Sequence, residues 1–476
     1  MNESKGIRLI ETIKSILLVV LFLFTVLLLF FFWENKPFQI FSKDDARAAD
    51  AMQLSEIFQP DHMEIYQGGD PCAVTREGFD VMIDCFKAFS ASKNLSIEVV
   101  PEDRYFEALK QPSIKAAFDY YVPFSSICEI YGIDKIAGSD SVDALSEFVY
   151  SVPFDDRMYM YDKKTNKYFR IVGSSNSCFD KLKSEIENVQ ADSVTYYPLH
   201  LLVGEIENGV LCPVSLESAI YDVPYYPEDY SSQAEKPSAV VKGFFSGNFD
   251  FVRRIEEENG TVIYMYGYGK IVVIAHNDGV LEFKTDDDRT AVQLKYLEAF
   301  EKANTFMAAH GAFESTGGIP LSPYVKDVII DPEGKKGFRF VFGVGTPLGR
   351  IYYQSGSPVI VDVIGGRVAY YKKEMINIDA SELDGAGQER REAFSAINVA
   401  ANNLEYIRDV LAGAQIIEDE NISNEELMEK VSGFDCGYFR PDNADEMLKA
   451  SWIVTAGGVE FYFGLDDGLP RGYSSL

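Results

Sequence analysis

VRRIEEENGTVIYMYGYGKIVVIAHNDGVLEF, residues 252–283, is the stretch of this sequence that decides the fold. It contains Asn259-Gly260 and Asn277-Asp278-Gly279, each between two runs of apolar and aromatic residues. Asn-Gly between such runs is a strong signal for a tight β-hairpin turn. The stretch therefore predicts an antiparallel β-meander.

A predicted helix follows the meander, and the same order of elements occurs again near the end of the chain. The first helix, within residues 289–307, has one apolar face: Val292, Tyr296, Ala299, Phe300, Ala303 and Met307. The second, within residues 388–411, has another: Phe394, Ile397, Ala400, Leu404, Ile407 and Leu411. Strand-like segments follow each helix. Since a helix packed across an antiparallel sheet is a stable two-layer arrangement, the predicted class is α+β, with antiparallel sheets each packed with helices.

Residues upstream of the meander alternate short strands and helices. Thr75 precedes an apolar helical pattern over residues 76–89 and is a candidate N-cap, and residues 157–172 predict a hairpin. A proline-containing segment, VPYYPEDYSSQAEKPSA, then reads as an extended linker. The predicted boundaries are a stub at 1–14, a transmembrane helix at 15–33, an N-terminal α+β domain at 44–205, a linker at 206–238, a middle α+β domain at 239–380 and a C-terminal helix-plus-sheet domain at 381–476.

The transmembrane prediction comes from KSILLVVLFLFTVLLLFFFWENK, residues 14–36. Residues 15–33 contain no charge, and a helix of that length is roughly 28 Å long, close to the thickness of the hydrocarbon core. The run is longer than the apolar core of most signal peptides and lacks a cleavage site directly after it. The positive N-terminal flank favours a cytoplasmic N-terminus. We therefore expect an uncleaved, single-pass signal anchor in the cell membrane, with the bulk of the chain outside the cytoplasm.

One face of this predicted helix is a candidate for contact with partner helices. Its residues step by three or four along the helix, with one polar residue beside them: Leu17, Leu21, Phe24, Leu28, Phe31 and Thr25. The segment contains no GxxxG, so association would rest on Leu and Phe packing and one hydrogen bond from Thr25. An anchor rich in Leu and Phe shows such a stripe even when it has no partner, and that alternative stays open.

Composition limits the function classes. The formal net charge of −30 disfavours binding to nucleic acid or to anionic lipid. The six cysteines are widely spaced and contain no CxxC, which argues against zinc ribbons and disulfide-dense scaffolds. One or two disulfides and buried free thiols remain alternatives.

Motifs of catalysis or metal binding are absent from the sequence. The four histidines, His62, His200, His276 and His310, have no partner at metal-ligand spacing, and HExxH and GxSxG do not occur. Residues 343–349, GVGTPLG, lack the third glycine of a dinucleotide-binding loop and read as a hairpin turn. The acidic runs 286–288 and 418–420 lack the ligand pattern of an EF-hand. We predict no catalytic residue, no metal site and no cofactor, although a carboxylate pair for sugar hydrolysis forms in space and not in sequence.

The organisation of the chain resembles the YycH family. A charged stub, one anchor helix and an acidic α+β body are typical of that family, and residues 243–283 are similar to its pattern of a Phe-rich start, an Arg- and Glu-containing strand, a glycine turn and aromatic strands. The later GTPLGRIYY and PVIVDVIGGRVAYYKK are similar to its turn and its strand that ends in Gly-Arg-Val. The cysteines depart from the pattern.

This resemblance implies regulation and not catalysis. YycH-like proteins act in low-GC Gram-positive bacteria with a YycI-like membrane protein on the sensor histidine kinase YycG, also called WalK, partly through membrane helices. The expected function is modulation of such a kinase by protein contact. The first alternative is an envelope-ligand binding protein on an inert anchor, and the second is a cell-wall hydrolase.

Overall fold

The computed structural model describes most of the chain after residue 50. The described residues are Leu21, 51–91, 95–151, 158–173, 182, 184, 194–204, 206–214, 216–218, 221–227, 239–245, 248–285, 292–311, 313, 321–347, 349–374, 376–378, 391–417, 422–442 and 447–475. Within them, no helix is both long enough and apolar enough to cross a bilayer. The predicted anchor, residues 15–33, lies outside the described residues except for Leu21.

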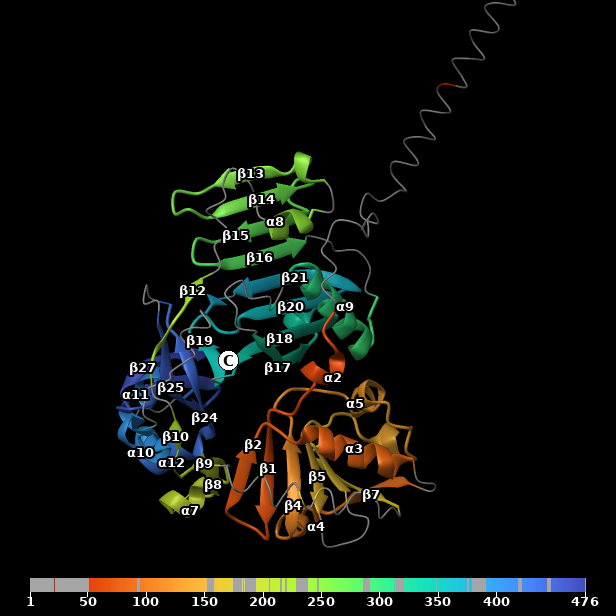
Figure 1. Ribbon diagram of the computed structural model, residues 1–476, viewed down its shortest axis with the longest axis vertical. Coiled ribbons are helices and arrows are strands. Elements are labelled where there is room, and N and C mark those ends of the chain that lie inside the picture. The colour runs from red at the N-terminus through yellow and green to blue at the C-terminus, as the bar shows by residue number, and fades with distance from the viewer. Residues whose placement is uncertain are drawn as a thin grey trace, which may run out of the picture.

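The N-terminal part is a nine-stranded antiparallel sheet in the order β3-β7-β6-β5-β4-β1-β2-β8-β9 (Figure 1). Its strands are β1 (His62–Gln67), β2 (Cys72–Thr75), β3 (Ser96–Val100), β4 (Pro112–Ala117), β5 (Glu147–Ser151), β6 (Met158–Asp162), β7 (Lys167–Val172), β8 (Val194–Pro198) and β9 (Leu211–Pro213). Helices α3 (Phe79–Ser90) and α5 (Phe124–Tyr131) pack on one face. There the ring centroids of Phe86 on α3 and Phe148 on β5 are 4.9 Å apart. Helix α4 (Glu102–Leu109) packs on the other face, and α7 (Leu199–Val203) joins β8 to β9.

The predicted helix at 76–89 is confirmed as α3, but its cap is not Thr75. The helix begins at Phe79 after Gly78, whose φ of 93° is open to glycine because it has no Cβ. Thr75 Oγ1 instead accepts a hydrogen bond from the N–H of Glu77, 3.1 Å away. The predicted hairpin within 157–172 is confirmed by the pairing of β6 with β7.

A second, 14-stranded sheet holds the rest of the body. Its strands are β11 (Val223–Pro224), β13 (Arg253–Glu256), β14 (Val262–Tyr266), β15 (Ile271–Ala275), β16 (Val280–Thr285), β17 (Ser322–Ile330), β18 (Gly337–Thr346), β19 (Gly349–Tyr353), β20 (Val359–Ile364), β21 (Arg367–Glu374), β24 (Val431–Arg440), β25 (Met447–Ala456), β26 (Val459–Gly464) and β27 (Pro470–Ser475). Neighbours in this sheet run antiparallel except at one place, where β19 runs parallel to β24. The sequence predicts a domain boundary between residues 380 and 381. This single parallel pair joins strands from the two sides of that boundary into one sheet. The domain boundaries themselves stay predictions.

Short strands fasten the predicted linker to the body. They are β10 (Glu217–Ser218), β11 (Val223–Pro224), β12 (Tyr226–Pro227), β22 (Ile376–Asn377) and β23 (Arg391–Glu392). β10 pairs with β23, β11 with β25 and β12 with β22. The described part of the linker is therefore paired at three places: β11 belongs to the larger sheet, and β10 and β12 each form a separate two-stranded sheet. Single-turn 3-10 helices occur at Ser139–Ser141, Phe249–Phe251 and Pro332–Gly334.

The predicted β-meander is confirmed by β13 to β16, which pair in sequence around the two asparagine-containing turns. The helix after it is α9 (Tyr296–Ala309), so Val292 was wrongly assigned to the helical face: it precedes the helix and is 58% exposed. The helix begins late because the Glu298 carboxylate accepts a hydrogen bond from the N–H of Lys295 and caps the first turn there. Phe244 directly follows helix α8 (Ala239–Gly243) and stacks on Phe283 of β16, with ring centroids 5.2 Å apart.

The second predicted helix is two helices, α10 (Ala396–Asn402) and α11 (Leu404–Gly413), followed by α12 (Asn424–Glu429). The break is at Asn403, whose side-chain NH₂ donates to the carbonyls of Val399 and Gly468 at 2.8 and 2.9 Å. The second of these bonds reaches outside the helix, which favours a bend over a straight continuation. The predicted hairpin at GVGTPLG is confirmed by the pairing of β18 with β19.

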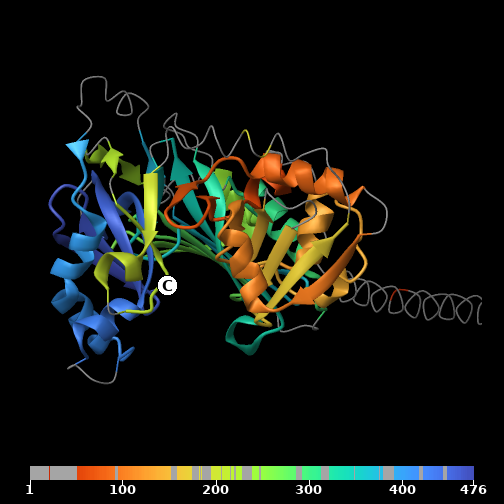
Figure 2. The same cartoon turned by 90° about the horizontal axis from the view of Figure 1, so that it is seen from below.

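The chain enters the body between its two sheets. Helix α2 (Leu54–Ile57) lies between α5 and the α9–β17 side of the larger sheet, as Figure 1 shows. Seen from below in Figure 2, the N-terminal sheet and the C-terminal strands flank the middle of the larger sheet. One continuous apolar core includes residues of all three parts.

Candidate functional site at the domain junction

The face of the N-terminal sheet on which α4 packs carries a row of polar side chains beside a small apolar cluster. Alternate residues of a strand point to the same face, so β1 places His62, Glu64 and Tyr66 together. Glu64 is paired in register with Lys115 on β4, whose Nζ lies 2.8 Å from Glu64 Oε2. Lys115 also lies 3.6 Å from the Glu147 carboxylate on β5. This row of opposite charges crosses three neighbouring strands.

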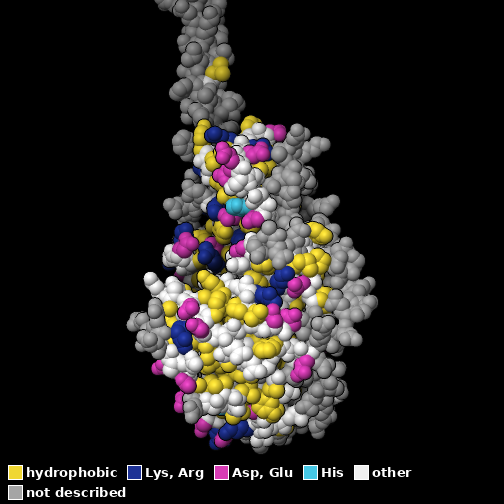
Figure 3. Space-filling model, turned by 90° about the vertical axis from the view of Figure 1, so that its left-hand side faces the viewer, with side chains coloured by type: hydrophobic (Ala, Val, Ile, Leu, Met, Phe, Trp, Pro, Cys, Tyr) yellow, Lys and Arg dark blue, Asp and Glu magenta, His cyan; other side chains and the backbone are white. Residues whose placement is uncertain are grey.

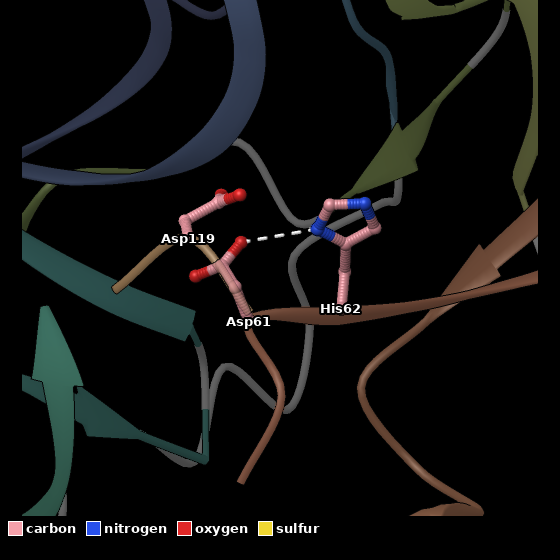
Figure 4. Close-up of side chains that lie close together, drawn as sticks. All are labelled: Asp61, His62 and Asp119. Carbon is pink, nitrogen blue, oxygen red and sulfur yellow. Dashed lines mark hydrogen bonds and ion pairs between the residues drawn. The ribbon is translucent and has the colours of Figure 1, made fainter. Parts of the chain in front are cut away.

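Asp61, His62 and Asp119 gather at the end of this row (Figure 4). Asp61 comes just before β1, its N–H donates to the carbonyl of Ala117 at the end of β4, and Asp119 follows two residues later. His62 Nδ1 lies 3.2 Å from Asp61 Oδ2, and the three side chains offer ligand atoms that all lie within 4.8 Å of one another. The antiparallel register of β1 and β4 thus brings residues 58 positions apart to one point.

The protonation of these groups follows from their neighbours. Burial lowers the pKa of His62, but hydrogen bonds to the Asp61 and Glu64 carboxylates outweigh it and raise that pKa to about 10. Burial raises the pKa of Asp61, but Arg350 and His62 outweigh it and hold that pKa well below its usual range. Burial, followed by the charge of Asp61, raises the pKa of Asp119 to about 6. At neutral pH a protonated imidazole therefore lies between carboxylates.

Arg350 on β19 connects this cluster to the larger sheet. Its Nη1 lies 2.5 Å from Asp61 Oδ1, and its Nη2 donates to the Asp61 backbone carbonyl at 3.1 Å. Its guanidinium also lies 4.1 Å from the centroid of the Tyr324 ring on β17, a cation–π distance. Arg350 is therefore held on two sides and joins the N-terminal sheet to the middle of the larger sheet.

Asp435 on β24 adds the C-terminal part of the chain to the same network. Arg350 Nη1 lies 3.7 Å from Asp435 Oδ2, and Arg76 of the N-terminal part lies 2.6 Å from the same oxygen. The Tyr352 hydroxyl donates to Asp435 as well. Burial raises the pKa of Asp435, but Arg76 and Arg350 outweigh it and lower that pKa. We call Asp61, Arg76, Arg350 and Asp435 the junction network, because they join all three parts of the body.

A cleft of about 300 Å³ opens beside Asp119. Its lining residues are Ala117, Phe118, Asp119, Tyr120, Tyr121, Ala144, Ser146, Glu147, Tyr161, Lys163 and Lys164. Lys164 Nζ lies 2.7 Å from the Asp143 carboxylate and 4.9 Å from the centroid of the Tyr121 ring. The cleft thus combines carboxylates, lysines and tyrosine faces, which suits a small polar ligand.

The segment that enters the body, residues 52–61, is wedged into the same junction. The Phe58 side chain is 0% exposed, and its ring centroid lies 4.3 Å from that of Phe300 on α9. The Asn304 side-chain NH₂ donates to the carbonyl of Met52 at 2.8 Å. These contacts place the first described residues of the body against both sheets.

On the face in Figure 3, charged side chains of both signs are present. There, acidic and basic side chains of the described residues are interspersed among apolar ones and form no broad basic patch.

The predicted partner-contact residues of the anchor lie outside this description, except for Leu21, which is helical and exposed. The acidic runs 286–288 and 418–420 also lie outside the described residues. Of the histidines, His310 is buried against Phe244, and His200 lies 3.2 Å from the carbonyl of Asn208. Of the described cysteines, Cys72, Cys128, Cys212 and Cys436 are free thiols.

Sequence reasoning missed the cluster around His62. Its signal was the adjacent pair Asp61-His62 at the start of a strand, but the third member, Asp119, becomes a neighbour only through the pairing of β1 with β4. Arg350 and Asp435 are still farther away along the chain. No spacing rule finds groups that are brought together by sheet register.

No protein-family model matches this chain, and no curated protein matches its sequence. Among solved structures, the crystal structure of YycH from Bacillus subtilis superimposes with a TM-score of 0.57, over 86% of this chain and 96% of that chain, at 10% sequence identity. The chain has the YycH fold. The part of this chain outside the superposition is smaller than any of the three predicted domains, so the YycH fold includes some of each. The resemblance stated from the sequence is confirmed at the level of the fold.

Proposed function

We propose that this protein is a membrane-anchored regulator that modulates a YycG/WalK-like sensor histidine kinase by protein contact, together with a YycI-like membrane protein. The observation that supports this most is the YycH fold over nearly the whole length of YycH. The second support is the sequence resemblance of residues 243–283, which form the β13–β16 meander. In this proposal the protein transforms no substrate.

The proposed anchor helix, residues 15–33, makes the contact inside the membrane, with its N-terminus in the cytoplasm and its body outside. The contact residues that we propose are Leu17, Leu21, Phe24, Thr25, Leu28 and Phe31. Helices in lipid associate through packing, and a differential affinity for two kinase states of about 1–3 kcal/mol is enough for regulation.

The junction network offers a route between the anchor and the outer domains. The chain that leaves the anchor continues into residues 52–61, which contact α9 through Phe58 and β19 through Asp61. A shift of this segment changes contacts in both sheets at once. A partner that binds the outer domains can therefore bias the position of the anchor, and the reverse also holds.

The test is an exchange of residues 15–33 for an unrelated anchor of equal length in the full chain, with kinase autophosphorylation measured in membranes. The regulator proposal expects loss of kinase control, whereas an inert tether predicts retained control. In-membrane crosslinking from Leu21 and Leu28 should capture the kinase or the YycI-like protein. Val19 and Val26, on the opposite side of the predicted helix, are the matched control positions and should capture neither.

A second candidate function is binding of an envelope ligand, because the cleft beside Asp119 has the size and polarity for one. The anchor exchange would leave this function intact. Since Asp119 and Glu147 both line that cleft, the hydrolase alternative is tested in the same preparation. Release of soluble fragments from peptidoglycan by the purified body would replace the regulatory proposal with an enzymatic one.

A further inference from the structure

We infer that Asp61, His62 and Asp119 form a binding site for one divalent metal ion of the zinc class. Each residue offers a ligand atom, and all three atoms lie within 4.8 Å of one another. Ligands on zinc at bond lengths of about 2.0–2.2 Å lie about 3–3.5 Å apart, and His62 Nδ1 is 3.2 Å from Asp61 Oδ2. The inference goes beyond the proposed regulatory function and does not depend on it.

The ligands are oriented by a second layer of contacts, as in built metal sites. His62 Nε2 lies 3.1 Å from Glu64 Oε1, which leaves Nδ1 directed at Asp61 and Asp119 (Figure 4). A carboxylate that holds the second ring nitrogen is the usual companion of a metal-binding histidine. Glu64 is itself fixed by Lys115.

Asp61 is oriented in the same manner. Arg350 Nη1 binds its Oδ1 and leaves Oδ2 on the side of His62. The N–H of Asp61 is bonded to Ala117, and its carbonyl accepts from Arg350. The position of Asp61 is therefore set by the backbone of β4 and by the Arg350 side chain on β19.

The charge of the site favours a cation. Asp61 and Asp119 place two carboxylates close together, and like charges at this distance repel unless a cation or a proton lies between them. In the wider cluster five carboxylates face four cationic groups: Asp61, Glu64, Asp119, Glu147 and Asp435 against Arg76, Lys115, Arg350 and the protonated His62. A divalent ion that binds His62 Nδ1 displaces its proton to solvent and takes the place of the imidazolium between the carboxylates; the loss of one positive charge and the gain of two then balance the remaining excess.

The donor set indicates the class of metal. Calcium and magnesium prefer oxygen ligands only, whereas an imidazole with two carboxylates suits zinc and related transition metals. Three protein ligands leave a fourth position on a tetrahedral ion. Asp119 lines the 300 Å³ cleft, so that position is accessible to water or to a ligand oxygen from the cleft.

The test is calorimetric titration of ZnCl₂ into the full chain, purified in detergent after treatment with a chelator. The wild-type protein should bind one zinc ion saturably, and Asp119→Asn and His62→Gln should each weaken binding at least about 10-fold. The controls are Asp134→Asn, at an exposed aspartate, and His200→Gln, at a half-buried histidine; both should bind like wild type. Thermal melts of each variant show whether it is folded, and Asp119→Asn keeps the test valid if His62→Gln unfolds.

Four results would overturn the inference. The first is no saturable zinc binding by the wild-type protein, and the second is unchanged affinity in a folded Asp119→Asn variant. The third comes from Co²⁺ as a spectroscopic probe, because a thiolate charge-transfer band would place the metal on cysteines. Tighter binding of Ca²⁺ than of Zn²⁺ would likewise contradict the assigned metal class.

Discussion

Arg350 Nη1 lies 2.5 Å from Asp61 Oδ1, although 289 residues separate the two positions. Arg350 belongs to β19, the strand whose parallel pairing with β24 joins the middle and C-terminal parts. Asp61 belongs to the segment through which the chain enters the body. A single guanidinium thus connects the entry segment to the point where the larger sheet is joined.

Removal of this guanidinium should therefore cost more than the loss of an ordinary surface ion pair. Arg350→Ala leaves the Asp61 and Asp435 carboxylates partly buried without this partner, and we expect a loss of about 3–5 kcal/mol, as for other broken buried pairs. Thermal unfolding and hydrogen exchange of residues 52–61 measure it. Arg254→Ala, which breaks the more exposed pair with Glu256, is the control and should cost less than about 1 kcal/mol. Equal melting temperatures for the two variants would refute this role.

The Phe58 side chain should also stabilise the junction between the N-terminal part and α9. Phe58→Ala removes a fully buried ring that contacts Tyr120 in the N-terminal part and Phe300 on α9, and we expect a cost of about 3–5 kcal/mol. Exchange of the amides in α2 and in the first turn of α9 should speed up. Phe106→Ala, at a phenylalanine that is 46% exposed, should change either measurement little. A Phe58→Ala variant as stable as Phe106→Ala would show that the wedge is not structural.

The parallel pair of β19 and β24 should tolerate no side chain at Gly437. A Cβ at this position would lie 2.5 Å from the carbonyl oxygen of Arg350, which is backbone and cannot rotate away. Gly437→Ala is therefore expected to separate the two strands and lower the melting temperature. Gly433→Ala, on the same strand, meets Thr455 at an ordinary 3.7 Å and should be close to wild type. Crosslinking between β19 and β24 that persists unchanged in Gly437→Ala would contradict this prediction.

His310 should make the body sensitive to mild acid. Burial, with Lys373 nearby on β21, lowers its pKa from 6.5 to about 4 in the folded state. Because the unfolded chain binds a proton below about pH 6.5 and the folded chain does not, stability contributed by neutral His310 is complete above pH 6.5 and is lost as the pH falls toward 4. Over that interval the loss is about 1–3 kcal/mol.

The measurement is the difference in melting temperature between pH 7 and pH 4.5. His310→Gln keeps a group that can hydrogen-bond to the carbonyl of Phe306, so the variant should lose less stability on acidification than wild type does. His200→Gln is the control, and its acid loss should match that of wild type. An undiminished acid loss in His310→Gln would assign the sensitivity to carboxylates instead.

Local patterns predicted the elements of the fold well. The β13–β16 meander followed from Asn259-Gly260 and Asn277-Asp278-Gly279, and α3 and α9 followed from apolar faces of helical spacing. Errors occurred where a side chain bonds beyond its own element. Asn403 splits a predicted helix by reaching Gly468, and Glu298 moves the start of α9 beyond Val292.

The candidate site could not be predicted in the same manner. Its residues follow no recognisable sequence motif. They come together only through three strand pairings: β1 with β4, β18 with β19 and β19 with β24. The row from His62 to Glu147 shows the difficulty, because alternation along β1 explains why its charges share a face, but only strand order places Lys115 and Glu147 beside them. Register between distant strands is set by the packed core and not by local propensity.

The burial of Phe58 at the junction also limits where a protease can cleave this chain without disrupting the body. Cleavage after Phe58 would break the covalent link between this buried residue and strand β1. Cleavage before Met52 would leave intact the contacts of residues 52–61 with α9. A shed form of the body that keeps its shape should therefore begin at or before Met52. With the anchor that we propose, release from the membrane and loss of the junction contacts would be separate events that depend on the position of the cleavage.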